Sequence, residues 1–182
     1  MEPVVSGPQR TKFAWVAGLV AAVALGLFIA AGPAALRRPL LTPLGAGLLL
    51  GLLVPQLTAA EATRTRRWLP PFLCGVALFV WHAEQFRRIE QAAAVRIREQ
   101  PAQLPALMLV EQASADDPGS EPGYRALRLS VRPTVRDYLS ERSAVLLGER
   151  PWPLPAVWLV LETGLAMLVA ACLRAQAEQT AL

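Results

Sequence analysis

The sequence predicts an all-α membrane protein with four transmembrane helices and a small α+β insert between the third and fourth helices. Two observations lead to this fold class. Apolar residues make up 54% of the chain, and most of them fall in long runs, which a soluble globule rarely contains. The basic residues lie mainly outside these runs, where they contribute to membrane orientation. They form no basic face interleaved with aromatic residues, so we expect no nucleic-acid partner.

The first two predicted transmembrane helices are residues 13–32 and 40–57, after a polar tail over residues 1–12. The first run has twenty residues without a charge, enough to cross a hydrocarbon core of about 30 Å. A signal peptide is the alternative, because basic residues precede the run and small residues end it. Small side chains recur at helical spacing in both runs and predict sites of close helix packing: Gly18, Ala22, Gly26, Gly47 and Gly51.

The third and fourth predicted transmembrane helices are residues 68–86 and 152–173, and residues 174–182 form a second polar tail. The third is cleanly apolar only over residues 69–81, so a re-entrant or interfacial segment is the alternative. Four crossings would place every tryptophan near one of the two membrane interfaces, which tryptophan prefers. They would be Trp15 and Trp68 on one side and Trp81, Trp152 and Trp158 on the other.

Residues 87–151 form the predicted extramembrane insert, in the order helix, β-hairpin, helix. The first helix continues from the third span, with Glu84 and Arg88 spaced for an ion pair. The hairpin would join residues 106–110 to residues 127–131, where apolar and polar residues alternate.

The last helix of the insert is predicted over residues 135–147. Thr134 followed by Asp137 resembles a capping box, and Gly148 suits the position after the last turn. The apolar spacing predicts that Val135, Leu139 and Leu146 face inward.

Three ionisable residues form the one candidate site that the sequence offers. Glu162 lies in the middle of the fourth run, and His82 and Glu84 lie near the end of the third. Inside a bilayer such groups would make a proton or cation site. The alternative is a structural role, in which a neutral Glu162 forms a hydrogen bond with a neighbouring helix.

The sequence lacks the motifs that several enzyme classes require. The sequence contains no GxxxxGK[ST] loop, no GxSxG and no HExxH motif. His82 and Glu84 are two residues apart and would point in different directions on a helix, so no metal site is expected. Cys74 and Cys172 lie in apolar runs and are expected to be buried thiols. We therefore expect no enzyme, no catalytic residues and no cofactor.

The sequence favours a non-enzymatic structural or accessory subunit of a membrane complex, of unknown specific function. The alternative is a small transporter or ion-translocating component that uses Glu162, and a membrane enzyme comes third. Expected partners are the lipid bilayer and either another membrane protein or further copies of the chain. The location would be a plasma or inner membrane. Basic residues in the short connections place both termini in the cytoplasm and the insert outside.

Overall fold

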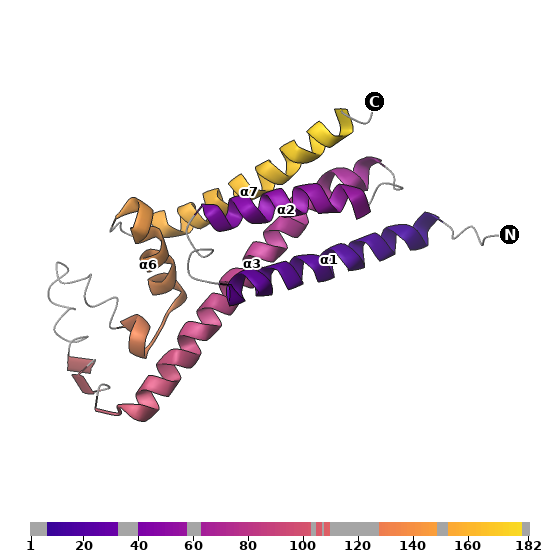
Figure 1. Ribbon diagram of the computed structural model, residues 1–182. Helices are drawn as coiled ribbons and strands as arrows, with labels where there is room; N and C mark the ends of the chain where they lie inside the picture. Colours follow the sequence, from indigo (N-terminus) through magenta and orange to yellow (C-terminus); the bar gives the residue numbers. More distant parts are fainter. Residues whose placement is uncertain are drawn as a thin grey trace. The chain divides into compact units, whose positions relative to one another are not determined.

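A computed structural model describes five helices of the chain (Figure 1). The described residues are 7–32, 40–57, 63–102, 105–106, 108–109, 128–148 and 153–179. The helices are α1 (Gly7–Ala31), α2 (Leu41–Leu57), α3 (Thr63–Glu99), α6 (Val135–Leu147) and α7 (Leu154–Gln179). The chain divides into two compact units: unit 1 is Met1–His82 with Val160–Leu182, and unit 2 is Ala83–Leu159.

The predicted β-hairpin is wrong, because the described residues of both expected strands are helical. Residues 105–106 and 108–109 have helical conformation, and so do residues 128–131. In the second segment, the backbone N–H of Arg132 donates to the carbonyl oxygen of Arg128 at 2.7 Å, as in a helical turn. Five alternating residues are too short a pattern to exclude a turn of helix. The described part of the chain therefore contains helices and no strand.

The prediction of four transmembrane helices is also wrong. Among the described residues, one helical segment is long and apolar enough to cross a membrane, Leu154–Gln176 within α7. Two others, Trp15–Ala31 and Leu41–Val54, are apolar but shorter than 18 residues. α3 has 37 residues, but arginines stand at both of its ends, so only its middle is apolar. Among the described residues, only one of the four predicted runs thus forms an apolar helix of spanning length.

Unit 1 is assembled through glycine contacts between pairs of helices. A Cβ placed on Gly47 of α2 would lie 2.6 Å from the carbonyl oxygen of Ala166 in α7, and one on Gly51 would lie 3.1 Å from the Cα of Ala170. From the first contact to the second, the residue number rises by four in both helices, so α2 and α7 run parallel.

α1 and α3 pack together in the same way. A Cβ on Gly18 would lie 2.7 Å from Cδ1 of Leu73, and one on Gly26 would lie 2.5 Å from the carbonyl oxygen of Ala77. These two helices also run parallel to each other, and opposite to α2 and α7 (Figure 1).

The core of unit 1 is apolar and built from small and medium side chains. Trp81, which the sequence places at a membrane interface, is instead wholly buried. It packs in one cluster with residues of all four helices of the unit, among them Ala22, Leu50, Leu73, Cys74, Leu78, Ala166 and Ala170. The outer surface of the unit is also apolar. Exposed side chains include Val20, Leu27 and Phe28 of α1, Leu48, Leu49, Leu52 and Leu53 of α2, Phe72 and Phe79 of α3, and Leu161 and Leu168 of α7.

The predicted α6 is confirmed in its bounds and its caps. The side-chain oxygen of Thr134 accepts a hydrogen bond from the backbone N–H of Asp137 at 3.2 Å. Gly148 follows the last turn with a positive φ of 65°, and its N–H donates to the carbonyl oxygen of Ala144. A left-handed φ suits glycine, which has no Cβ to clash. The C-terminal half of α3 meets α6 through the rings of Phe86 and Tyr138, whose centroids are 6.0 Å apart.

The predicted inward face of α6 is only partly correct. Leu139 is buried as expected, but Val135 and Leu146 are 56% and 44% exposed. Polar side chains take their place inside the unit: the buried residues of α6 are Asp137, Tyr138, Leu139, Ser140 and Ser143.

Candidate functional site

Glu162 is a buried acid on the inward face of α7. It is 2% exposed, and the residues one and two turns later, Ala166 and Ala170, are 0% exposed. Arg174, one further turn along, is 4% exposed. Residues four apart lie on the same side of a helix, so α7 turns a stripe with an acid at one end and a base at the other toward the interior of unit 1. A charged group at such a site must find a partner or a proton.

The parallel register of α2 and α7 brings a second polar residue to the level of Glu162. Gly47 faces Ala166 and Gly51 faces Ala170, so Pro43, one turn earlier in α2, lies level with Glu162. Thr42 is the neighbour of Pro43 in the first turn of α2 and is 4% exposed. A hydroxyl group and a carboxyl group are thus buried at the same end of this helix pair.

α3 contributes two more polar side chains near that level. A Cβ on Gly75 would lie 3.9 Å from the sulfur of Met167, and α3 runs opposite to α7 (Figure 1). Five residues further along α3 is Val80, which this register places level with Glu162. Trp81 and His82 follow directly, with ring centroids 4.6 Å apart.

We call these four residues the polar layer of unit 1: Thr42, Trp81, His82 and Glu162. Each of them makes a hydrogen bond, a ring contact or an electrostatic interaction. Two members, His82 and Glu162, were predicted as site residues. The sequence predicts an interfacial position for Trp81. Nothing in the sequence marks Thr42, because it reaches this level only through the packing of α2 on α7.

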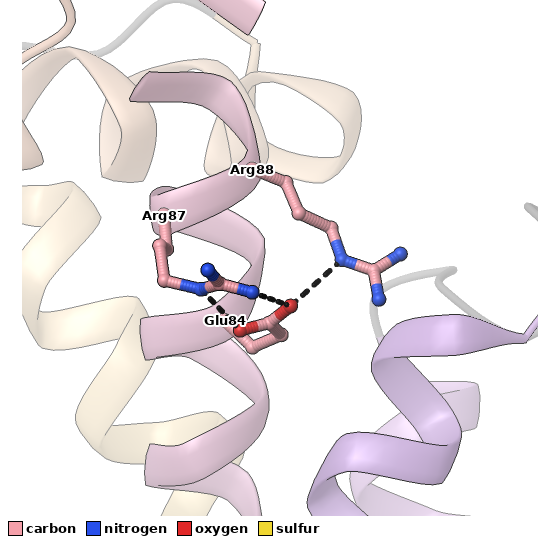
Figure 2. A network of polar contacts seen from close by, with 3 residues as sticks. All are labelled: Glu84, Arg87 and Arg88. Carbon is pink, nitrogen blue, oxygen red and sulfur yellow. Dashed lines mark hydrogen bonds and ion pairs between the residues drawn. The ribbon is translucent and has the colours of Figure 1, made fainter. Parts of the chain in front are cut away.

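Glu84 belongs to unit 2, and its carboxylate is held by two arginines of its own helix (Figure 2). Arg87 donates from Nε to Oε2 at 2.7 Å and from Nη2 to Oε1 at 2.9 Å, and Arg88 donates from Nε to Oε1 at 3.0 Å. The predicted pair with Arg88 is confirmed. The contact with Arg87 was missed, although its spacing of three residues is also compatible with a helix pair.

These hydrogen bonds set the charge state of Glu84. Those from Arg87, followed by those from Arg88, lower the pKa of the Glu84 carboxyl from 4.5 to about 2. The same interaction raises the pKa of the Arg87 guanidinium. Glu84 is therefore ionised and paired at neutral pH, which suits a structural ion pair better than a proton-exchanging group.

A second charged contact in unit 2 supports the start of α6. Arg128 donates from Nη2 to Oδ1 of Asp137 at 3.0 Å, and the Thr134 hydroxyl donates to Oδ2 of the same carboxylate at 2.7 Å. Asp137 thus accepts from both sides while its own backbone N–H is capped. Sequence reasoning identified the Thr134–Asp137 contact but missed Arg128, because nothing in a spacing of nine residues points to a contact.

The polar layer is therefore the candidate site. A buried carboxyl, a buried hydroxyl and a partly buried imidazole can together hold a proton or a small cation, or can fix the packing of three helices. Within the described ranges, no three His, Cys, Asp or Glu side chains gather as metal ligands would. Comparisons with protein-family models, with curated proteins and with solved structures found no match to this chain.

Proposed function

We propose that the chain is an integral membrane protein and a non-enzymatic accessory subunit of a membrane complex, located in a plasma or inner membrane. Support for the membrane comes first from α7. Its segment Leu154–Gln176 has the length and composition of a membrane-crossing helix, and only 17% of its most apolar window is buried. An apolar helix in the core of a soluble protein would be mostly buried, so this surface needs an apolar environment outside the chain.

The outer surface of unit 1 supports the same proposal. Large apolar side chains are exposed on α1, α2 and α3 as well as on α7, with Phe28 and Phe79 exposed by 70% and 73%. In water a continuous apolar surface of this kind leads to aggregation. Next to lipid chains it carries no such penalty, because lipid is as apolar as leucine.

The subunit role depends on a single observation, the exposed apolar side chains of α6. This helix buries Asp137, Ser140 and Ser143, while Val145 is 73% exposed and Val135 is 56% exposed. A helix on a surface that faces water would have its polar side chains on the outside. The exposed Val135, Val145 and Leu146 of α6, which share its outer surface with Arg136 and Glu141, therefore fit contact with a partner surface.

Copurification in mild detergent tests this role. We expect a stoichiometric partner, or a second copy of the chain, to copurify with the wild-type protein and to be lost when both Val145 and Leu146 are changed to serine. Glu141→Ser is the matched control, because it also introduces serine at an exposed position of α6 but removes no apolar side chain. Retention of the partner by the double variant, or isolation of a monomer from the wild type, would contradict the proposal.

The polar layer favours a second candidate, a small ion-translocating component. Glu162 is the acid that would carry the proton or cation, with Thr42 and His82 near its level. In sealed vesicles that contain the purified protein, a proton flux that Glu162→Gln abolishes would support this candidate. Equal flux in protein-free vesicles and in vesicles with the wild-type protein would remove it.

A further inference from the structure

The arginines and lysines that the structure describes in unit 1 all lie at one end of it. This is the end where α1 and α3 begin and where α2 and α7 finish (Figure 1). We call it the basic end, and its six described bases are Arg10, Lys12, Arg64, Arg66, Arg67 and Arg174. Its described acid is Glu178 alone.

The opposite end of unit 1 has a different charge. Its described residues include one acid, Glu162, and no arginine or lysine. Arg37 and Arg38, in the connection from α1 to α2, lie outside the described residues. The described part of unit 1 is therefore basic at one end only.

The register between α3 and α7 places the basic end at the level where the apolar segment of α7 finishes. That segment is Leu154–Gln176, so Arg174 lies in its last turn. A Cβ on Gly75 of α3 would lie 3.9 Å from the sulfur of Met167 in α7, and the two helices run in opposite directions (Figure 1). Seven residues back along α3 and seven forward along α7, Trp68 is therefore level with Arg174.

α1 reaches the same level with Lys12. Gly18 of α1 faces Leu73 of α3, and the two helices run parallel. Six residues back along both helices, Lys12 is therefore level with Arg67. Lys12 is exposed, so at least one base of α1 is open to a ligand at this level.

Residues at the start of α3 change from basic to aromatic to apolar within two turns. Trp68, which is 68% exposed, directly follows Arg66 and Arg67, and Phe72, one turn later, is 50% exposed. The ring of Phe72 packs against that of Trp15 in α1, with centroids 5.7 Å apart. Tryptophan next to arginine is typical of the headgroup level of a bilayer, where the ring contacts lipid and its N–H contacts water. A small anion in solution would leave the exposed rings in water, so this order of residues favours a phospholipid.

We infer that the basic end binds the headgroups of anionic phospholipids, an inference that rests on the proposed membrane location. Each arginine or lysine next to an anionic membrane surface strengthens the attraction by about fivefold. Six described bases against one acid give this end a charge of one sign, which a zwitterionic headgroup, having no net charge, does not balance. Arg174 is 4% exposed, so it adds charge at this level, while Lys12 offers a direct contact.

Lipid binding by the full-length protein tests this inference. The probe is phosphatidylglycerol with a dansyl group in its acyl chain, titrated into the protein in dodecyl maltoside micelles, and binding is followed by energy transfer from tryptophan. We expect the probe to bind about tenfold more tightly than phosphatidylcholine with the same label. In about 0.5 M sodium chloride this preference should largely disappear, because salt screens exposed charges. Equal affinity for the two lipids at low salt overturns the inference.

Two triple variants with the same loss of charge locate the bound lipid. The basic-end variant is Lys12→Gln, Arg66→Gln and Arg67→Gln, and the control is Arg96→Gln, Arg98→Gln and Arg132→Gln at exposed positions of unit 2. The first should weaken binding of the probe by at least about tenfold, and the second should leave it unchanged. If the basic-end variant does not give monodisperse protein, Lys12→Gln alone should weaken binding by about fivefold. Equal weakening in the two triple variants, or none in Lys12→Gln, overturns the inference.

Two further arms identify the ligand and the level of failure. Inorganic phosphate in large excess, at constant ionic strength, should not displace the probe, and displacement would make a free anion the ligand and overturn the phospholipid assignment. Flotation is run after the protein is transferred from detergent into phosphatidylcholine vesicles. A chain that stays in the aqueous fraction defeats the membrane proposal itself, whereas a floating chain without a preference for phosphatidylglycerol defeats this inference alone.

Discussion

The helices α2 and α6 are both short and both expose apolar side chains, but they bury opposite chemistry. α2 buries a stripe of small and apolar residues, among them Ala46 and Gly47, and its backbone comes close to that of α7. α6 buries Asp137, Ser140 and Ser143, which are held by hydrogen bonds such as that from the Ser143 hydroxyl to the Ser140 carbonyl oxygen at 3.1 Å.

The difference indicates what stabilises each unit. In unit 1 the helices are held together by close packing. Added volume in the interior should therefore lower the stability of the unit, whereas exchanging one exposed apolar residue for another should leave it unchanged. In unit 2 the start of α6 is held by directed polar contacts, so the loss of one oxygen should matter more than volume. Glu162, like Arg174, is an exception within unit 1, because it is a buried ionisable residue on a face packed by shape.

The largest expected effect comes from placing a lysine at the position of Glu162. Glu162→Lys introduces an ammonium group at a position that is 2% exposed, and an uncompensated buried charge costs several kcal/mol. Glu162→Gln, the control, keeps hydrogen-bonding capacity without a charge and should be tolerated. We expect a normal yield of monodisperse protein for the glutamine variant and almost none for the lysine variant. Equal yields would mean that water reaches the site.

The next effect compares two glycines of α2. A Cβ on Gly47 meets the Ala166 carbonyl oxygen at 2.6 Å, whereas one on Gly45 meets nothing within 4 Å. Gly47→Ala should destabilise unit 1 by about 1–3 kcal/mol, because backbone cannot move aside. Gly45→Ala should stabilise the helix by about 0.5–1 kcal/mol. Thermal unfolding midpoints of the two variants in detergent should therefore move in opposite directions, and a shift in the same direction would refute packing by shape.

Local signals in the sequence predicted α6, and non-local packing explains what they missed. The Thr134–Asp137 spacing and Gly148 mark the ends of the helix through contacts within a few residues, so both bounds were predictable. The inward face was partly wrong at Val135, because apolar periodicity assumes an apolar interior and water outside. The hairpin was wrong because alternation over residues 127–131 also fits a turn of helix.

The same contrast between local sequence signals and non-local packing applies to the four predicted spans and to the site. Composition identifies residues 13–32 and 40–57 as apolar runs, but among the described residues the apolar helical segments there, Trp15–Ala31 and Leu41–Val54, are shorter than 18 residues. Glu162 and His82 were predictable as rare ionisable groups next to apolar runs. Thr42 was not, because its level depends on the register between α2 and α7.

The third effect tests the polar support of α6. Thr134→Ala removes the oxygen that accepts from the Asp137 N–H and the hydroxyl that donates to Oδ2 of Asp137. Loss of such an N-cap costs about 0.5–2 kcal/mol. Thr134→Ser keeps both hydrogen bonds and serves as the control. We expect faster amide exchange in the first turn of α6 for alanine only, and unchanged protection in that variant would show that Arg128 alone holds the start of the helix.

The smallest expected effect concerns Glu84, where a polar contact lies at the surface and contributes little to stability. Its folded-state pKa of about 2 is below its usual value of 4.5. The ion pairs therefore stabilise the folded state fully above about pH 4.5, and this stabilisation is lost as the pH falls from 4.5 toward 2. A carboxyl carbon titration by NMR of the full-length protein should report the low value directly. Arg87 donates two hydrogen bonds and Arg88 one, so Arg87→Gln should raise the pKa of Glu84 further than Arg88→Gln does. An equal rise in both variants would show that charge alone, without the geometry of the two hydrogen bonds from Arg87, sets the pKa.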